Sequence, residues 1–256
     1  MEKICIIIPA YNEEKRIERT LEGYSKYFSE LNNHGILDLK ILVVINGSID
    51  GTENVVQGFV ESNKNISYIK LVEAGKGNAV IQGFKKALKE DYGLIGFSDA
   101  DMATPPEEFF KLIKACEGFD GAIADRYQKK SKITPRPSFQ RLIAKRMFNF
   151  VSRALLILPY GDTQCGAKIF RRESLERIMP KITMSKWAFD VDLLYNLHKK
   201  NFKIKSVPIS WHDEAYSTLN FWKSGPGMVL GIVRLRLINS PLKSFVKFYD
   251  KFLSKS

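Results

Sequence analysis

Two carboxylates one residue apart are the part of this sequence best suited to chemistry. Residues 94–97 are apolar and predict a short strand, and Asp99 and Asp101 follow it directly. Side chains two positions apart in an extended chain share a face, so both acids can point the same way. Hard oxygen ligands without His or Cys suit Mg²⁺ or Mn²⁺, and Mg²⁺ often takes its other ligands from water and substrate phosphate. The pair therefore indicates a divalent metal site, although two solvated acids in a turn fit the same motif.

Three earlier segments place similar polar loops after apolar strands. Continuous apolar, β-branched runs predict buried strands at residues 4–8, 39–45 and 66–72, and apolar residues at helical spacing follow each loop. Strands that alternate with helices up to about residue 115 are typical of an α/β fold, a mostly parallel sheet with helices on both faces. Because ligands of such sheets bind beyond the carboxyl ends of the strands, we expect the four loops to converge on one crevice.

The second half of the chain is strongly basic. Nine basic residues and no acidic one lie between Arg126 and Arg153, and apolar residues at helical spacing predict an amphipathic helix over about 138–158. The tail, residues 222–256, holds seven basic residues and one acid and is amphipathic as well. Further strands are predicted at 122–124, 167–170 and 203–210, and further helices at 174–178 and 189–198.

Composition limits the partners of the protein more than its fold. The 256 residues are 45% hydrophobic, enough for one large folded domain or two small ones, and the net charge is +12. Such a charge favours nucleic acid, anionic lipid or phosphorylated substrates as partners. No apolar stretch reaches 18 residues, so we expect any membrane contact to be peripheral. Three widely spaced cysteines without CxxC spacing indicate a reduced, cytosolic setting.

The loops after the four strands resemble those of a known enzyme family. In order along the chain, the motifs at residues 9–14, 47–52, 75–79 and 99–101 are similar to those of the inverting GT-A glycosyltransferases. The resemblance implies a Rossmann-like GT-A sheet that binds a sugar nucleotide. A metal held by carboxylates can bind both phosphates of such a donor and neutralise the charge of the departing diphosphate.

Two later motifs resemble a narrower branch of that family. Asp162 to Gly166 together with Lys168, and then Trp187 to Tyr195, are similar to the dolichyl-phosphate β-glucosyltransferases, close relatives of the dolichyl-phosphate mannose synthases. The resemblance covers roughly residues 4–240. It implies a single GT-A domain over residues 1–256. Its expected parts are a nucleotide-sugar and metal half at about 1–120, an acceptor half at about 121–220 and a basic amphipathic tail at about 221–256.

The resemblance also assigns roles at the donor site. It implies that Asp101 is the more direct metal ligand and that Asp99 contacts the metal or the ribose. Asn46 stands where many family members have an Asp that contacts the base ring, and it also suits a turn before Gly47. Lys76, between two glycines, is either a donor-site cation or an exposed loop lysine. The residues expected to frame the base and ribose are Pro9, Tyr11, Asn12 and Glu13.

On the acceptor side the resemblance implies a lipid phosphate held by cations. The second pKa of a phosphate monoester is about 6, so the attacking oxygen is ionised at neutral pH and no strong base is needed. Cations must hold this phosphate in line with the anomeric carbon, opposite the departing diphosphate. Arg126 and Arg141 match the acceptor-phosphate arginines of the family, and Arg146 is the alternative if the alignment shifts by a turn.

Several other residues match the branch pattern with less definite roles. Asp162 is the base for a sugar hydroxyl in other branches, but with a phosphate acceptor it would orient the donor or hold Lys168. Trp187 can stack on the sugar. A loop near His212 supplies Arg or Lys to the donor phosphate in relatives, and this chain offers only Ser217 and Lys223 there, so that role is open. The remaining matching residues, each also suited to core packing, are Gln164, Asp190 and Asp192.

The sequence therefore predicts a metal-dependent, inverting transferase that moves a hexose from a nucleoside-diphosphate sugar to a polyprenyl, dolichyl-type phosphate. UDP-glucose is the first choice of donor and GDP-mannose the second. A transferase acting on a soluble sugar hydroxyl is the alternative enzyme, and a nucleic-acid-binding module is the alternative outside enzymes, although we expect no nucleic acid partner. We expect a cytoplasmic protein, peripheral on the cytoplasmic face of an anionic membrane, with its basic helix and tail at the headgroups.

Overall fold

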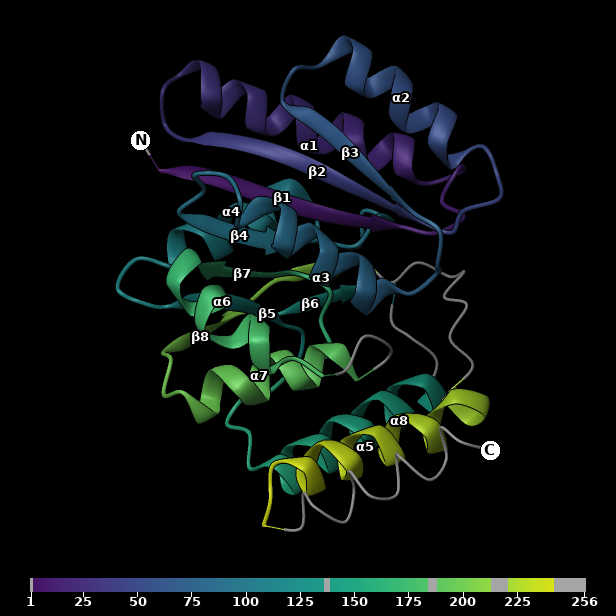
Figure 1. Ribbon diagram of the computed structural model, residues 1–256, viewed down its shortest axis with the longest axis vertical. Coiled ribbons are helices and arrows are strands. Elements are labelled where there is room, and N and C mark those ends of the chain that lie inside the picture. Colours follow the sequence, from purple (N-terminus) through teal and green to yellow (C-terminus); the bar gives the residue numbers. More distant parts are fainter. Residues whose placement is uncertain (1, 136–138, 184–187, 213–220, 242–256) are drawn as a thin grey trace.

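The central feature of the protein is one large β-sheet with helices on both faces (Figure 1). The computed structural model describes residues 2–135, 139–183, 188–212 and 221–241. The strands of the sheet are β1 (Lys3–Ala10), β2 (Asp38–Asn46), β3 (Ile66–Leu71), β4 (Leu94–Phe97), β5 (Gly121–Asp125), β7 (Lys168–Arg171) and β8 (Ile204–Pro208). Their order across the sheet is β3-β2-β1-β4-β7-β5-β8.

Most neighbouring strands of the sheet are parallel. The exceptions are the two pairs that β7 forms, with β4 on one side and β5 on the other. The parallel strands β1, β2 and β4 therefore end at the same edge of the sheet. Because β7 runs the other way, the loop that precedes β7 reaches that same edge from the second half of the chain.

Helices connect most of these strands. Helix α4 begins with a proline at its first position, where the missing N–H costs no helical hydrogen bond. The helices are α1 (Ile17–Asn33), α2 (Thr52–Ser62), α3 (Lys76–Ala87), α4 (Pro106–Ala115), α5 (Phe139–Leu156), α6 (Arg172–Ile178), α7 (Phe189–Lys199) and α8 (Phe221–Ile238), with a 3-10 turn η1 (Met179–Lys181) after α6.

The sheet separates two hydrophobic cores, because alternate side chains of a strand point to opposite faces. On β1, Ile4, Ile6 and Ile8 pack into a core shared with α1, α2 and α4. Cys5 and Ile7 pack into the other core, which α3, α6 and α7 cover. Both faces of β1 are thus buried, which explains why its sequence is continuously apolar.

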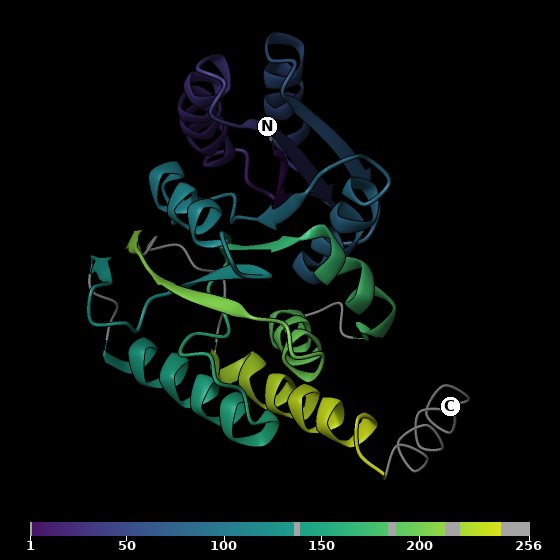
Figure 2. The same ribbon diagram turned by 90° about the vertical axis from the view of Figure 1, so that its left-hand side faces the viewer.

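Helices α5 and α8 form a separate layer beyond the second core. They lie side by side in Figure 1 and in the view of Figure 2, which is turned by 90°. Phe148 and Leu156 of α5 and Ile232 and Leu235 of α8 pack into the second core. Phe150, in contrast, is 71% exposed. Helix α5 therefore attaches to the sheet through one face and leaves apolar side chains on another.

A two-stranded parallel sheet, β6 (Lys132–Thr134) with β9 (Ser210–His212), corrects one expectation from the sequence. The predicted single strand at 203–210 is divided, since β8 ends at Pro208 and β9 begins at Ser210. Pro208 has no N–H to donate to the ladder. The next N–H, of Ile209, donates to Ser131 Oγ at 3.2 Å. The chain therefore leaves β5 and continues beside β6.

The predicted α/β fold with a mostly parallel sheet and helices on both faces is confirmed. Helices also lie at the predicted positions around 138–158 and 189–198. The expectation of amphipathic helices throughout the tail stays a prediction, because residues 242–256 lie outside the described residues. Within the described part of the chain, no helix combines the length and apolarity that crossing a bilayer requires.

Candidate functional site

Hydrogen bonds join the loops after β1 and β2 into one wall of the site. The N–H of Asn12 donates to Ser48 Oγ at 3.1 Å, and the N–H of Glu13 donates to Thr52 Oγ1 at 2.8 Å. In return, Asn12 Oδ1 accepts from the N–H of Ile49 at 3.0 Å. Asn12 has a φ of 52°, a left-handed conformation that Asn tolerates better than most residues. The two polar loops therefore lie together at the carboxyl ends of their strands.

Asn46, expected near the nucleobase, braces this wall from inside. Its side chain is buried. Its Nδ2 donates to the carbonyl of Ala10 at 2.8 Å, and its Oδ1 accepts from the N–H of Gly75 at 2.9 Å. These bonds tie β2 to the end of β1 and to the loop before α3. The contact between Asn46 and a base stays a prediction, since its described bonds are internal.

Asp99 and Asp101 have opposite electrostatic surroundings. Asp99 forms an ion pair with Lys76, the first residue of α3. Burial raises the pKa of Asp99, but the Lys76 ammonium, together with Lys168 and Arg126, outweighs burial and holds that pKa below its usual value. For Asp101, burial and then the charge of Asp99 raise the pKa to about 6. The surroundings therefore stabilise the ionised form of Asp99 and disfavour the ionised form of Asp101.

A glycine from the second half of the chain packs against this pair. A Cβ on Gly166 would overlap the carboxylate of Asp99, so only glycine allows the backbone to approach so closely. The approach follows from the antiparallel pairing in which Phe97 lies opposite Lys168. The N–H of His212 also donates to the carbonyl of Ala103 at 2.9 Å, which brings β9 to the same loop.

The carboxylate pair fits a hard divalent cation. Among the described residues there is no cluster of three or more His, Cys, Asp or Glu side chains suited to hold a metal. Two carboxylates are nevertheless the set that Mg²⁺ combines with water and substrate phosphates. Asp101 Oδ1 accepts from the N–H of Ala103 at 3.0 Å, which orients its carboxylate. A bound cation would offset the repulsion that raises the pKa of Asp101.

Glu13 lies within the electrostatic field of the same pair. Its carboxylate accepts two hydrogen bonds from Arg16, at 2.7 and 2.8 Å. Burial nevertheless raises the pKa of Glu13 to about 7, with Asp101 and Asp99 adding to the increase. Arg16 is a residue that the sequence analysis missed, and its position three residues after Glu13 was the available signal.

Lys168 is a fully buried cation, and its partner differs from the one considered from the sequence. Its ammonium donates to Asp190 Oδ1 at 2.6 Å and to the carbonyl of Cys165 at 2.5 Å. Asp162 therefore does not hold Lys168, which was one of the two roles considered for it; Asp190 holds Lys168 instead. Asp192 is also buried and accepts from the N–H of Thr183 at 2.7 Å, which ties the first turn of α7 to Thr183.

Arg126 and Asp162 form a buried, bidentate ion pair. Arg126 Nε donates to Asp162 Oδ2 at 2.6 Å and Nη2 donates to Oδ1 at 3.0 Å, with side chains only 10% and 1% exposed. The guanidinium also lies over the ring of Trp211, 4.9 Å from its centroid. Burial raises the pKa of Asp162, but Arg126 outweighs burial and lowers it. A carboxylate that has a lowered pKa and accepts two hydrogen bonds from a guanidinium group is a weak proton acceptor.

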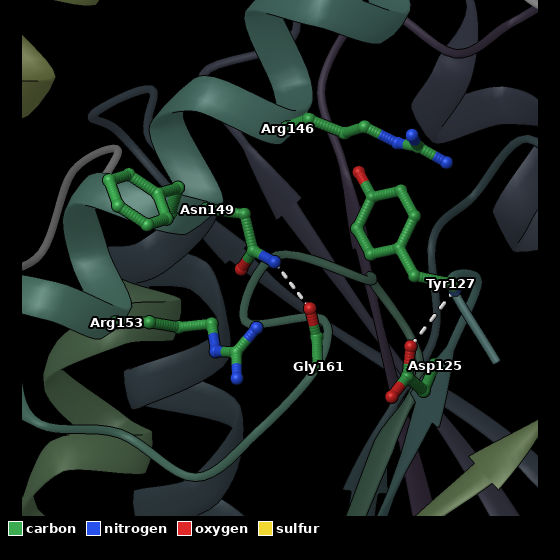
Figure 3. Close-up of a pocket in the computed structure, with 7 residues that line it drawn as sticks. Asp125, Tyr127, Arg146, Asn149, Arg153 and Gly161 are labelled. Atoms are coloured by element: carbon green, nitrogen blue, oxygen red, sulfur yellow. Dashed lines mark hydrogen bonds between the residues drawn. The ribbon is translucent and has the colours of Figure 1, made fainter.

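A cavity of about 300 Å³ opens beside this ion pair, between α5 and the loops after β5 and before β7 (Figure 3). Two arginines from α5 point toward it, with Tyr127 and Asp125 across the opening. We call it the arginine pocket, and its lining residues are Asp125, Tyr127, Arg146, Asn149, Phe150, Arg153 and Gly161. Tyr127, Asn149 and Arg153 were not singled out from the sequence, although Arg146 and Arg153 stand two helical turns apart.

The expected site residues fall into three groups. Those after β1, β2 and β4 lie along one edge with Lys76, and the Arg126–Asp162 and Lys168–Asp190 pairs lie in the second half of the molecule. Gln164 connects to the Arg126–Asp162 pair, because its N–H donates to Asp162 Oδ1 at 3.1 Å. Trp187 and Ser217 lie outside the described residues, as do the side chains of Arg141 and Lys223. Tyr11 is half exposed at the rim, whereas Pro9 is buried.

Comparisons with solved structures match this architecture. Glucosyl-3-phosphoglycerate synthase from Mycobacterium tuberculosis, solved with Mn²⁺, UDP and phosphoglyceric acid, superposes with a TM-score of 0.66 at 17% identity, covering 92% of this chain and 78% of that one. The mannosyltransferase PcManGT from Pyrobaculum calidifontis, solved with GDP-Man and Mn²⁺, gives a TM-score of 0.62 at 17% identity, covering 93% and 64% of the two chains. These likenesses support the GT-A fold.

Comparisons of sequence identify the family as well as the fold. A dolichyl-phosphate β-glucosyltransferase from Dictyostelium discoideum is 32% identical over 91% of this chain and 73% of its own length. A polyprenol monophosphomannose synthase from Mycolicibacterium smegmatis is 29% identical over 82% of this chain and 77% of its own length. The model of glycosyl transferase family 2 matches residues 5–179, which include the loops after β1, β2 and β4, Lys76 and the Arg126–Asp162 pair. The protein is a glycosyltransferase that belongs to glycosyl transferase family 2.

Proposed function

We propose that the protein transfers glucose, with inversion, from UDP-glucose to a polyprenyl phosphate. The observation that carries the proposal is that the protein has two sites suited to ligands of opposite charge. At the carboxyl ends of the strands, Asp99 is paired with Lys76, whereas burial and the charge of Asp99 raise the pKa of Asp101. Beside the Arg126–Asp162 pair lies a pocket bordered by two exposed arginines. The first suits a metal with a nucleoside diphosphate and the second suits a second phosphate.

On the donor side, Asp101 and Asp99 would hold Mg²⁺ or Mn²⁺. The bound ion would neutralise the diphosphate that leaves with negative charge. Lys76 already contacts Asp99, so its ammonium would face the same phosphates when the carboxylate turns to the metal. Glu13, with Tyr11 and Asn12, would bind the ribose and base.

On the acceptor side, no strong base is needed. A phosphate monoester has a second pKa of about 6 and attacks as an anion at neutral pH. Two carboxylates in that half are engaged in ion pairs, Asp162 with Arg126 and Asp190 with Lys168. This engagement speaks against the alternative in which Asp162 deprotonates a soluble sugar hydroxyl. It supports an acceptor that brings its own negative charge.

The names of the relatives rank the donors. Several dolichyl-phosphate β-glucosyltransferases are similar to this chain at 27–32% identity, and the polyprenol monophosphomannose synthase at 29%. UDP-glucose is therefore our first choice, and GDP-mannose is the second. Dolichyl-type or related polyprenyl phosphates are the acceptors that these names support.

The outer face of the helical layer supports a peripheral site of action on a membrane, which we propose to be on its cytoplasmic face. Ile143, Met147 and Phe150 of α5 are exposed at helical spacing, and Leu230 and Val233 of α8 are exposed as well. Apolar side chains of this kind, with Lys and Arg beside them, are typical of helices that lie in the headgroup region of a bilayer. Each well-placed cation adds about 1 kcal/mol of attraction to an anionic surface.

A panel of donors and acceptors tests the proposed function. Purified protein is incubated with UDP-glucose, GDP-mannose and other UDP- or GDP-sugars, a polyprenyl phosphate and Mn²⁺ or Mg²⁺, and radiolabelled lipid is extracted. We expect labelled lipid with UDP-glucose and release of UDP, and loss of both when the metal is chelated.

Two outcomes of the panel would contradict the proposal. If the protein transferred sugar to a soluble sugar acceptor and to none of the polyprenyl phosphates tested, the lipid assignment would be overturned. Equal turnover after exhaustive chelation would remove the metal from the mechanism. Preference for GDP-mannose would correct the donor and leave the acceptor standing.

A further inference from the structure

Helix α1 holds the loop that follows β4 and carries the two carboxylates. We call this loop, residues 98–104, the carboxylate loop. Thr20 Oγ1 of α1 donates to the carbonyl of Ala100, the residue between the two acids, at 2.7 Å. The carbonyl of Arg16, in the preceding turn of the helix, lies 3.5 Å from the same hydroxyl, so the bond to the loop is the stronger one. Because Thr20 is fully buried, water does not compete for this bond.

Tyr24 makes two further contacts with the same loop. It lies four residues after Thr20, on the same face of the helix. Its hydroxyl donates to the carbonyl of Thr104 at 2.9 Å, and Ser98 Oγ lies 2.8 Å from the hydroxyl oxygen. Because a phenol has one proton and a carbonyl can only accept, Ser98 must donate to Tyr24. The Tyr24 hydroxyl thus connects the first and last residues of the carboxylate loop.

The position of this hydroxyl is set by the hydrophobic core. The ring of Tyr24 is fully buried. Its centroid lies 5.7 Å from that of Phe28 and 6.2 Å from that of Phe109, the latter in an edge contact. Phe109 belongs to α4, the helix that follows the carboxylate loop. A loop that is bound to this hydroxyl is therefore anchored to packed helices on both of its sides.

The backbone of the carboxylate loop has a conformation that needs such support. Met102 has a φ of 61°, in the left-handed region that residues other than Gly rarely adopt. Its side chain reaches back to α1, since a Cβ on Gly23 would overlap the methyl group of Met102. An unfavourable backbone conformation persists only where the surrounding structure determines it. Thr20, Gly23 and Tyr24 contact the loop from one face of α1 and so contribute to holding it.

The direction of the Ala100 carbonyl bears on the geometry of the two acids. This carbonyl belongs to the peptide group that joins Ala100 to Asp101, so its orientation determines where the Asp101 side chain begins. Asp101 Oδ1 in turn accepts from the N–H of Ala103 at 3.0 Å. Mg²⁺ demands nearly ideal octahedral geometry from its ligands. A loop that could rotate at Ala100 would let the carboxylates of Asp99 and Asp101 diverge.

We propose that Thr20 and Tyr24 are positioning residues of the metal site, whose hydroxyl groups hold the carboxylate loop in the conformation in which Asp99 and Asp101 bind one divalent cation. This inference rests on the proposed function, which assigns the cation to these two acids. Groups that orient metal ligands typically contribute roughly 10–100-fold to metal affinity or activity. Because both hydroxyl groups bind the backbone of the loop rather than the carboxylates, we expect the lower end of that range.

The experiment measures Mn²⁺ binding to the full-length protein by electron paramagnetic resonance, with and without UDP. Thr20→Val and Tyr24→Phe nearly keep the shape of each side chain and remove its hydroxyl group, and each should weaken Mn²⁺ binding about tenfold. Thr20→Ser keeps the hydroxyl group and should bind Mn²⁺ as the wild type does. Urea denaturation of the metal-free proteins shows that each variant is folded and how much stability it has lost.

Two variants elsewhere control for the loss of a hydrogen-bonded hydroxyl group. Ser174 of α6 is buried and its Oγ donates to the carbonyl of Asp120 at 3.1 Å, so Ser174→Ala matches the threonine variant. The Tyr68 hydroxyl of β3 accepts from Gln57 Nε2 at 3.0 Å, so Tyr68→Phe matches the tyrosine variant. Both controls should keep the wild-type affinity for Mn²⁺. If they lost as much Mn²⁺ affinity as the α1 variants, the effect would be general loosening and the inference would be overturned.

Kinetics distinguish a positioning residue from a metal ligand. In Thr20→Val both carboxylates remain, so raising the Mn²⁺ concentration should restore most of the transfer rate. In Asp101→Asn a ligand is lost, and added Mn²⁺ should not restore the rate. A loss of transfer in Thr20→Val that saturating Mn²⁺ leaves in place would overturn the inference. So would unchanged Mn²⁺ affinity in the Thr20→Val, Tyr24→Phe double variant.

Hydrogen exchange separates this inference from the proposed function. Amide exchange of residues 98–104, measured by mass spectrometry on the metal-free protein, should be faster in both α1 variants and unchanged in both controls. If the wild type binds no Mn²⁺ with UDP while exchange follows this pattern, the metal assignment of the proposed function fails and the hydroxyl groups still hold the loop. If the wild type binds Mn²⁺ and transfers sugar, and the double variant keeps its Mn²⁺ affinity and exchange, the positioning role fails and the function stands.

Discussion

The donor edge and the arginine pocket differ in the charge that each lacks. At the donor edge, formed by Glu13, Asp99 and Asp101, burial and mutual repulsion raise the pKa values of two of the three carboxyl groups. In the arginine pocket, two exposed arginines have no described carboxylate partner. We therefore expect a cation to stabilise the first region and an anion to stabilise the second.

Between these regions stand two buried ion pairs that are complete by themselves. Arg126 with Asp162 and Lys168 with Asp190 have their charges satisfied within the protein. Both cations still lower the pKa of Asp99, so their fields reach the donor edge. The comparison teaches that the buried pairs position the loops, whereas the incomplete regions on either side are the ones we propose to bind substrates.

The largest expected effect follows from removing a carboxylate at the donor edge. Asp101→Asn should reduce metal-dependent transfer roughly a thousandfold, because charge stabilisation by a metal is worth several kcal/mol. Rates with saturating UDP-glucose and Mn²⁺ measure it. Asp91→Asn, at an exposed position paired with Lys3, is the control, and an Asp101→Asn enzyme as active as this control would show that the donor edge does not bind the metal.

The next effect concerns the buried pair beside the pocket. Asp162→Asn leaves the Arg126 guanidinium buried without its counter-charge, and we expect it to lower the free energy of unfolding by roughly 3 kcal/mol. Urea denaturation measures the change. An unfolding free energy within experimental error of the wild type would mean that the pair is solvated, and Arg126 would then be available to an acceptor.

The contribution of the Arg126–Asp162 pair to stability should depend on pH, because the pKa of Asp162 in the folded protein is held below its ordinary value of 3.8. The stabilisation from its ionised form is fully present above that ordinary value and is lost as the pH falls through the folded pKa. The difference in unfolding free energy between wild type and Asp162→Asn should therefore be constant near neutral pH and shrink below about pH 4. A difference that instead disappears between pH 6 and 7 would contradict the ion pair.

A smaller effect is expected where the second half of the chain touches the donor edge. Gly166→Ala introduces a Cβ against the Asp99 carboxylate, and such overpacking costs typically about 1–3 kcal/mol. It should also weaken Mn²⁺ binding in the presence of UDP, measured by electron paramagnetic resonance. Gly58→Ala on α2 meets no atom within 4 Å and should be neutral or slightly stabilising. Equal unfolding free energies and equal Mn²⁺ affinities for the two variants would show that Gly166 does not pack closely against Asp99.

The smallest effect concerns Lys76, which contacts Asp99 where a metal would compete. In Lys76→Met, binding of Mn²⁺ without nucleotide should tighten severalfold because the competing ammonium is gone, and sugar transfer should slow because a cation facing the diphosphate is lost. Titration with Mn²⁺ and steady-state kinetics measure the two changes. Weaker Mn²⁺ binding in this variant would argue that Lys76 organises the pair.

The sequence by itself determined the donor edge. Continuous apolar strands followed by polar loops and helices predicted a mostly parallel sheet, and parallel strands bring their carboxyl ends to one edge, so Glu13 and Asp99 were expected at the same edge. The fold and the family were predicted for the same reason, since both depend on short motifs in a fixed order along the chain.

Tertiary structure alone decided how the charged side chains pair in the second half of the chain. Which carboxylate pairs with which buried cation depends on the antiparallel β7 and on α7, elements far apart in the sequence, so Asp162 met Arg126 while Lys168 met Asp190. The arginine pocket likewise depends on Asn149 tying α5 to a loop twelve residues later. Residue types and spacing predict contacts within one strand-loop-helix unit, whereas contacts between units follow from packing, which no local pattern records.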